Sequence, residues 1–150
     1  MAVDVRTEIV IQRPRAEVAA FASDPDNATR WYDNITSVEW QTEPPLAVGS
    51  RLAFVAPFVG SRLEYIYEVL EWEPGELFVM RTEQGPFPMD TTYTWQDAAG
   101  SATRMALCNR GEPSGLSKVS GRLIARAMRR ANRKDLARLK ALMEVEPATA

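Results

Sequence analysis

The sequence predicts an α+β domain in which an antiparallel sheet of six to seven strands precedes one long C-terminal helix. Strand-like segments separated by turn residues recur over the first 109 residues, whereas the stretch from Gly115 to about Glu144 lacks proline and is rich in helix formers. Runs of strands followed by a helix favour an antiparallel sheet. A sheet this wide tends to curl, so we expect it to wrap around the helix. The 150 residues, 45% of them hydrophobic, fit one domain over residues 1–150.

The first 31 residues are expected to form one strand and two short helices. Alternation of apolar and polar residues over residues 3–12 predicts the strand. Pro14 suits a first helical turn, and the apolar residues that begin at Val18 give the first helix an amphipathic pattern. Asp24 is a suitable N-cap, with a proline directly after it, for a second short helix that ends near Trp31.

Six further strands are expected after these helices. Each is bounded by proline- or glycine-containing breaks, such as Pro74-Gly75. The last two form a hairpin around residues 97–100. The segments predicted to be strands span residues 35–42, 50–56, 62–73, 77–84, 89–96 and 103–109.

The C-terminal helix is expected to be amphipathic, about 28 residues and so about 42 Å long. Its apolar residues recur at steps of three or four, and arginines occupy another face. The predicted inward stripe contains Leu116, Val119, Leu123, Ala127 and Ala131 and continues with Leu139, Leu142 and Met143. The arginine face contains Arg122, Arg126, Arg129, Arg130 and Arg133.

The net charge of −2 conceals an uneven distribution. Residues 1–117 hold 9 basic and 17 acidic side chains, whereas residues 118–150 hold 9 basic and 3 acidic ones. Such a split has two interpretations: a basic solvent face on a helix that lies against an acidic sheet domain, or a contact with an anionic partner. Nucleic acid is disfavoured because the basic helix lacks interleaved aromatic residues and the pI is near 5.3.

The chain contains no histidine, which narrows its possible chemistry. Ser-His-Asp and Cys-His catalysis are excluded, and a zinc site is not expected. No spacing typical of metal ligands or phosphate-binding loops occurs, so we expect neither metal nor cofactor. Cys108 is the only cysteine and cannot form an internal disulfide. The first residues lack the apolar run of a signal peptide. No stretch approaches the ~18 consecutive apolar residues that a membrane-spanning helix needs. A cytoplasmic location is the resulting expectation.

Five short motifs follow one another along the chain: residues 11–18 at the entry to the first helix, Asp24-Pro25 leading to Arg30-Trp31, Val48-Gly49-Ser50-Arg51 before a strand, Glu73-Pro74-Gly75-Glu76-Leu77 at a turn, and Asp135-Leu136-Ala137-Arg138-Leu139-Lys140 in the long helix. Together they resemble the START-like or SRPBCC superfamily, above all its small bacterial polyketide cyclase/dehydrase branch. The resemblance covers about residues 3–144 and leaves 145–150 as a tail. It implies a helix-grip fold, as in birch-pollen-allergen-type proteins, with a deep, mostly apolar cavity between sheet and C-terminal helix.

Candidate ligand-binding residues lie on the strand faces that alternation turns inward, because tyrosine and tryptophan combine an apolar body with one hydrogen-bonding group. Trp31 is added because the resemblance implies that a tryptophan here sits at the cavity mouth. The full set is Trp31, Phe54, Tyr65, Tyr67, Phe87, Tyr93, Trp95, Met105, Leu123 and Ala127. Packing of these side chains in an ordinary core is the alternative interpretation.

A catalytic role remains open, because the superfamily includes cyclases, hydrolases and binding proteins, and fold alone does not decide function. Without histidine, proton removal beside a carbonyl would need Asp, Glu or Tyr, with Arg stabilising an oxyanion. Arg81, Asp90 and Tyr93 are the candidates for these roles.

Three functional hypotheses follow. The first is a protein that binds a small hydrophobic or aromatic ligand in an internal cavity, with no nucleic acid partner. The second is a cofactor-independent polyketide cyclase or dehydratase that acts on a polyketide-like substrate in that cavity. The third is interaction with lipid or a membrane surface through the basic helix. A monomer and a homodimer are both compatible with the sequence.

Overall fold

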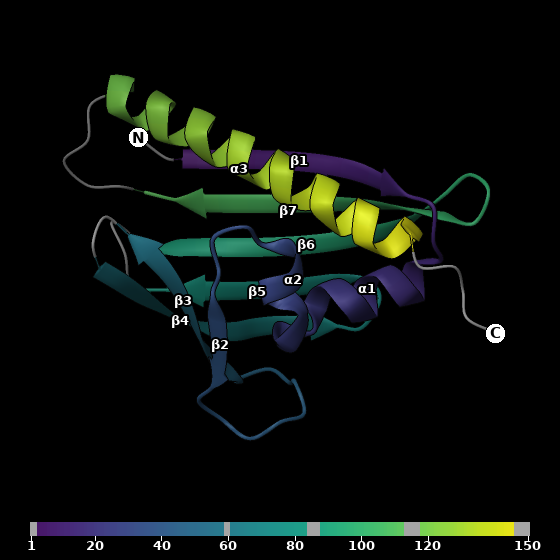
Figure 1. Ribbon diagram of the computed structural model, residues 1–150, viewed down its shortest axis with the longest axis horizontal. Helices are drawn as coiled ribbons and strands as arrows, with labels where there is room; N and C mark the ends of the chain where they lie inside the picture. The colour runs from purple at the N-terminus through teal and green to yellow at the C-terminus, as the bar shows by residue number, and fades with distance from the viewer. Residues whose placement is uncertain (1–2, 59–60, 84–87, 113–117, 146–150) are drawn as a thin grey trace.

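The described residues form seven strands, three α-helices and one 3-10 turn, as a computed structural model shows (Figure 1). They comprise residues 3–58, 61–83, 88–112 and 118–145. In chain order the elements are β1 (Val3–Ile11), α1 (Arg15–Ser23), the 3-10 turn (Pro25–Asn27), α2 (Ala28–Trp31), β2 (Ser37–Trp40), β3 (Arg51–Phe58), β4 (Ser61–Glu73), β5 (Leu77–Thr82), β6 (Met89–Ala98), β7 (Ala102–Gly111) and α3 (Lys118–Val145).

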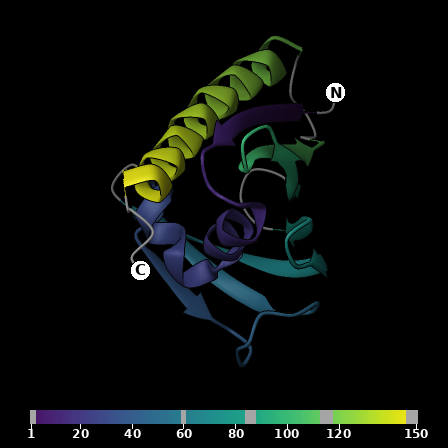
Figure 2. The same ribbon diagram turned by 90° about the vertical axis from the view of Figure 1, so that its right-hand side faces the viewer.

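The sheet has the order β1-β7-β6-β5-β4-β3-β2, and every neighbouring pair is antiparallel. Figure 2 shows the strands as an arc that begins with β1 beside α3 and ends with β2, with α1 and α2 inside the arc. A register shift opposite β5, between Val69 and Glu71, contributes to the curvature because bulges bend and twist a strand. The predicted curved antiparallel sheet with one long C-terminal helix, the helix-grip fold, is therefore confirmed.

Local signals at the beginning of the chain act as predicted. In β1, Val3 and Val5 are buried while Asp4 between them is exposed. The side chain of Asp24 accepts a hydrogen bond of 3.0 Å from the backbone N–H of Asp26, and Pro25 occupies the first position of the turn. The chain then continues into α2, which ends at Trp31.

The core lies between the concave face of the sheet and the helices. α3 contributes Leu136 and Leu139, which are at most 1% exposed, to the main core. Nearer its start, Ile124 and Met128 pack against a second buried cluster on β1. Among the described helices, none is long and apolar enough to cross a membrane.

The inward face of α3 differs from the predicted one. Leu123 is 62% exposed and Ala127 is also exposed, so neither contacts a ligand inside the domain; the predictions for these two residues were wrong. The displacement is confined to the first part of the helix, where the inward residues Ile124 and Met128 each follow a predicted one and lie about 100° further around the helix. The predicted Leu139, Leu142 and Met143 do pack against the core, together with Leu136, and Asn132 and Asp135 face inward between the two parts. Asn132 and Asp135 are polar and line the cavity. Hydropathy does not mark such residues as inward-facing, so it favoured the neighbouring stripe of Leu and Ala. Leu116 lies outside the described residues, as does the side chain of Val119.

Candidate functional site

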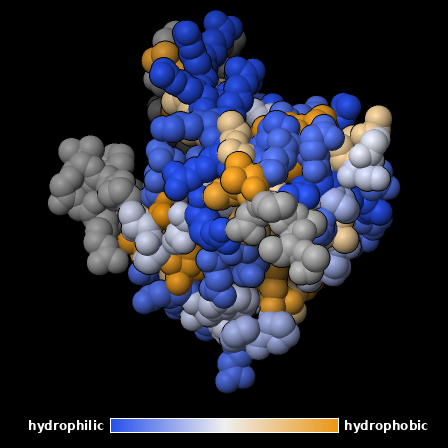
Figure 3. Space-filling model, turned by 45° about the vertical axis from the view of Figure 1, so that its right-hand side comes forward, coloured by the Kyte–Doolittle hydropathy of each residue, from blue (hydrophilic) through white to orange (hydrophobic). Residues whose placement is uncertain are grey.

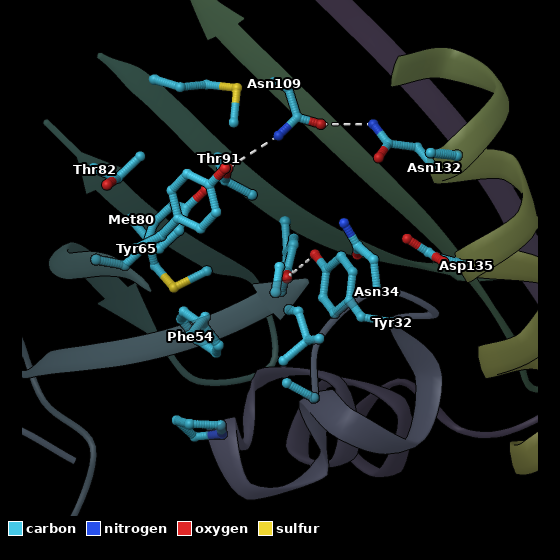
Figure 4. Close-up of a pocket in the computed structure, with 18 of the residues that line it drawn as sticks. Tyr32, Asn34, Phe54, Tyr65, Met80, Thr82, Thr91, Asn109, Asn132 and Asp135 are labelled. Atoms are coloured by element: carbon cyan, nitrogen blue, oxygen red, sulfur yellow. Dashed lines mark hydrogen bonds between the residues drawn. The ribbon is translucent and has the colours of Figure 1, made fainter. Parts of the chain in front are cut away.

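A cavity of about 380 Å³ lies between the sheet and the helices (Figure 4). Strands β3 to β7 form one side, and the segment around α2 together with α3 forms the other. Small-molecule sites begin at about 300 Å³, so the space accommodates a ligand of that class. Phe54, Phe78 and Met80 give the sheet side an apolar surface, and Ile124 and Met128 extend it onto α3.

A chain of buried hydrogen bonds crosses the cavity wall from α3 to the sheet. The Nδ2 of Asn132 donates to the Oδ1 of Asn109 over 2.6 Å, and the Nδ2 of Asn109 donates to the Oγ1 of Thr91 over 3.0 Å (Figure 4). All three residues are at most 7% exposed. Buried amides this well paired hold α3 in register with β6 and β7 and give the cavity polar groups at defined positions.

A second polar group is a pair of tyrosines. The hydroxyls of Tyr32, which follows α2, and Tyr93, on β6, are hydrogen-bonded to each other. Desolvation is the main cause that raises the pKa of both phenols well above the ordinary value of 10. Burial also raises the pKa of Tyr67 to about 12, against the opposing effect of its hydrogen bond with Thr91. At neutral pH these phenols are protonated and able to donate hydrogen bonds.

Asp135 is the buried acid of the cavity, only 5% exposed. Burial raises the pKa of its carboxyl to about 6, and the nearby charge of Asp33 acts in the same direction. The backbone N–H of Asp33, which donates to Oδ1 over 3.1 Å, opposes this shift, as do the cations of Lys134 and Arg138. Both cations pair with Asp33, at 3.3 and 3.7 Å. Apart from Asp135, the described lining has one ionisable carboxylate, the exposed Asp24, and it has no Lys or Arg.

The structure distributes the predicted ligand-binding residues over several places. Those that line the cavity are Phe54, Tyr65, Tyr67 and Tyr93. Phe87 lies outside the described residues. Those that are buried in the core without lining the cavity are Trp31, Trp95 and Met105. The expectation that Trp31, Trp95, Met105, Leu123 and Ala127 face the ligand is therefore corrected.

Trp31 is fully buried instead of lying at the cavity mouth. Its ring packs behind those of Tyr32 and Tyr93, with centroid distances of 4.1 and 5.8 Å. Because α2 ends at Trp31, the next side chain points in another direction and reaches the cavity. Trp95 shares the face of Tyr93 but lies two residues further along β6, about 7 Å away, where the core is closed.

The candidate pair Arg81 and Asp90 lies outside the cavity, which corrects the roles suggested for them. They form a two-pronged ion pair of 2.6 and 3.2 Å between β5 and β6, and the Arg81 side chain is 49% exposed. Alternation along β5 puts Arg81 on one face with Leu77 and Val79, and this face points outward. Phe78, Met80 and Thr82 form the inward face of β5. Of the three catalytic candidates, only Tyr93 lines the cavity.

Sequence reasoning missed the polar residues that give this cavity its character, namely Tyr32, Asn109, Asn132 and Asp135. A signal for two of them was present: Asn132 and Asp135 are spaced i, i+3 and continue into Leu136 and Leu139, a helical face that mixes polar and apolar residues. Asn109 lies on the alternating β7 face of Met105 and Leu107.

The fold and the cavity define the class of this protein: a helix-grip domain with an internal cavity. Comparison with known proteins identifies its family. Residues 2–144 match the family described as polyketide cyclase / dehydrase and lipid transport. The chain belongs to this family. No protein in a comparison with curated sequences matches the chain.

Several solved structures share the fold at low sequence identity. The Zhui aromatase/cyclase from Streptomyces sp. R1128 is 14% identical with a TM-score of 0.82, and the alignment covers 100% of this chain and 99% of that one. TTHA0849 from Thermus thermophilus is 20% identical with a TM-score of 0.76, covering 95% and 97%. The di-domain ARO/CYC BexL from the BE-7585A biosynthetic pathway is 19% identical with a TM-score of 0.80; the alignment covers 96% of this chain but only 48% of BexL.

Proposed function

We propose that this protein binds a small, uncharged hydrophobic or aromatic molecule that carries hydroxyl or carbonyl groups. The observation that supports this most is the composition of the cavity. Its lining combines aromatic and methionine side chains with amides, protonated phenols and one buried carboxyl. Such a site holds a flat apolar body and orients its oxygen atoms.

The charge of the cavity supports an uncharged ligand. A carboxylate or phosphate would enter a poorly hydrated space that holds Asp135 and, within the described lining, has no cation to pair with it. A hydroxyl group finds acceptors in Asp135 and the amide oxygens. A carbonyl group finds a donor in whichever hydroxyl of the Tyr32–Tyr93 pair accepts their mutual hydrogen bond, because its own proton is left to donate.

Thermal denaturation at pH 8 with 2-naphthol and with 2-naphthoate tests the proposal. We expect 2-naphthol to raise the Tm in a concentration-dependent way and 2-naphthoate to have little effect. Ala131 lies at the cavity rim, where it is exposed yet contributes to the lining, so Ala131→Trp is expected to block binding. Ala127→Trp is the matched control, because it adds the same ring one turn away on the outward face. Equal shifts with both probes, or in both variants, would contradict the proposal.

Polyketide cyclase or dehydratase activity is the second candidate, and Asp135 is the specific observation in its favour. A carboxyl with a pKa of about 6 is suited to remove a proton beside a ketone at neutral pH. Its charge raises the pKa of both Tyr32 and Tyr93, which means that the three groups interact across the cavity. The phenol that accepts the Tyr32–Tyr93 hydrogen bond would donate its own proton in a hydrogen bond to the developing enolate oxygen.

The binding and enzyme hypotheses are distinguished by comparing the wild type with the variant Asp135→Asn. Under the enzyme hypothesis this variant binds a polyketone but no longer accelerates loss of its α-proton, which NMR follows by exchange with deuterated solvent. Wild-type protein that binds the polyketone without accelerating exchange would leave binding as the function and exclude the enzyme.

A further inference from the structure

The first half of α3 carries a strongly basic face that the cavity does not use. Between Lys118 and Lys134 the sequence holds seven basic residues and no acidic one. At 100° per residue, the five arginines of this segment fall within an arc of about 100° on the side of α3 opposite Ile124 and Met128. We call this arc the arginine face; it consists of Arg122, Arg126, Arg129, Arg130 and Arg133, and four of these line a surface hollow.

The charges on the arginine face are not neutralised within the described structure. No ion pair among the described residues includes any of the five. The basic residues from position 134 onward differ, since Lys134 and Arg138 pair with Asp33 and Lys140 pairs with Glu144 at 2.6 Å. Like charges spaced i, i+4 destabilise a helix, so this arrangement is unfavourable in the isolated protein and becomes favourable against an anionic surface.

The shape of the molecule makes this face accessible. Figure 3 shows the first half of α3 as a hydrophilic projection at the top of the molecule, and Figure 2 shows it extending past the sheet. The charges of the remaining domain are mostly acidic, with 9 basic against 17 acidic residues up to position 117. A flat anionic surface would therefore meet the projecting basic helix first, and the acidic domain would turn away from it.

We propose that the arginine face docks on an anionic lipid bilayer. Leu123, 62% exposed at the edge of this face, would enter the layer below the headgroups while the arginines contact phosphate groups. No aromatic residue lies between positions 118 and 145, so the face lacks the stacking surfaces by which single-stranded nucleic acids are held. Ile124 and Met128 line the cavity from the opposite side of the same helical turns. In the docked state the cavity would therefore lie on the side of α3 that faces away from the bilayer. The docking does not depend on the proposed ligand.

Vesicle flotation tests the proposal, with phosphatidylcholine vesicles that contain or lack phosphatidylserine. We expect the wild-type protein to float only with the phosphatidylserine-containing vesicles, and less at high salt. Each arginine near such a surface contributes about fivefold in affinity, so Arg126→Glu combined with Arg130→Glu should weaken binding by at least about 25-fold. Leu123→Gln should weaken it by a smaller factor. The double variant relieves repulsion within the helix, so it is expected to fold, which circular dichroism checks.

The matched control is Arg51→Glu combined with Arg104→Glu, two exposed positions on β3 and β7 that give the same change in net charge. We expect this control to float like the wild type. The proposal is overturned if the wild type stays unbound at low salt, or if the control loses as much binding as the helix variant. It is likewise overturned if a single-stranded oligonucleotide binds the arginine face while phosphatidylserine vesicles do not. Naphthol binding is measured separately, so failure of docking leaves the cavity function unaffected.

Discussion

Replacement of Asp135 by Asn is expected to stabilise the folded protein at neutral pH, although Asp135 is buried and its carboxyl accepts a hydrogen bond. The reason is the cost of ionising this carboxyl inside the domain. An unfolded chain loses the Asp135 proton near pH 3.8, whereas the folded protein holds it until about pH 6. The folded state therefore binds more protons in this window, and stability falls as the pH rises through it.

The magnitude follows from the size of the shift. The difference between 3.8 and about 6, at about 1.4 kcal/mol per pKa unit, gives a loss of about 3 kcal/mol that is complete above pH 6 and nearly absent below pH 4. Asparagine cannot ionise, and its side-chain oxygen is still able to accept the N–H of Asp33. Lys134 and Arg138 pair with Asp33 and keep their partner in the variant.

Urea denaturation of the wild type and Asp135→Asn at pH 8 and pH 4.5 measures the effect. We expect the free energy of unfolding of the variant to be higher by about 3 kcal/mol at pH 8 and by about 1 kcal/mol at pH 4.5. The gain at pH 8 corresponds to a rise in Tm of roughly 6–12 °C. Asp4→Asn makes the same chemical change at an exposed position of β1 and should alter stability by less than about 0.5 kcal/mol. A variant no more stable than the wild type at pH 8, or a gain independent of pH, would refute the reasoning.

Three further predictions concern packing and hydrogen bonds. Leu139→Ala should lower the free energy of unfolding by about 2–5 kcal/mol, because this side chain is 0% exposed. Leu123→Ala should lower it by less than about 0.5 kcal/mol, because Leu123 is 62% exposed. Similar losses for the two variants in urea denaturation would mean that α3 is oriented differently. Asn109→Ala breaks two buried hydrogen bonds and should lower the free energy of unfolding by about 1–3 kcal/mol in urea denaturation. An unchanged urea midpoint would show that these hydrogen bonds contribute nothing to stability. Tyr93→Phe should lower the pKa of Tyr32 toward its ordinary value, seen as earlier phenolate formation in ultraviolet titration, and an unaltered titration curve would speak against their hydrogen bond.

The raised pKa of Asp135 also bears on function. A buried carboxyl that weakens the fold at neutral pH is the kind of residue expected at a working site, because function often requires groups that stability alone would not favour. A ligand hydroxyl that donates to this carboxylate would offset part of the cost, so a bound ligand should stabilise the wild type more than Asp135→Asn at pH 8.

Secondary structure was predictable from the sequence because its signals are local. The alternation in β1, the Asp24 cap before the 3-10 turn, and the turn at Pro74-Gly75 each depend on residues that are neighbours in the chain. Their order was enough to predict the antiparallel sheet and the long helix. The resemblance of short motifs then predicted the helix-grip fold and its cavity.

The site itself was only partly predictable, because its members meet across long sequence separations. Tyr32 and Tyr93 are 61 positions apart, and Asn132 reaches Asn109 from a helix whose orientation depends on the whole sheet. The sequence indicated that Tyr93 and Trp95 share one face of β6. It could not show where along that face the cavity ends and the closed core begins.

What the sequence determined by itself is the periodicity of each element: which strand residues share a face, where the helices begin, and that the first half of the long helix is basic. What only the tertiary structure decided is which face each element turns inward and how much space remains between them. The curvature of the sheet turned Arg81 outward, and packing against β1 rotated α3 so that Asn132 and Asp135, rather than Leu123, face the interior. Periodicity depends on local backbone geometry, whereas orientation and cavity shape depend on contacts among all layers of the fold.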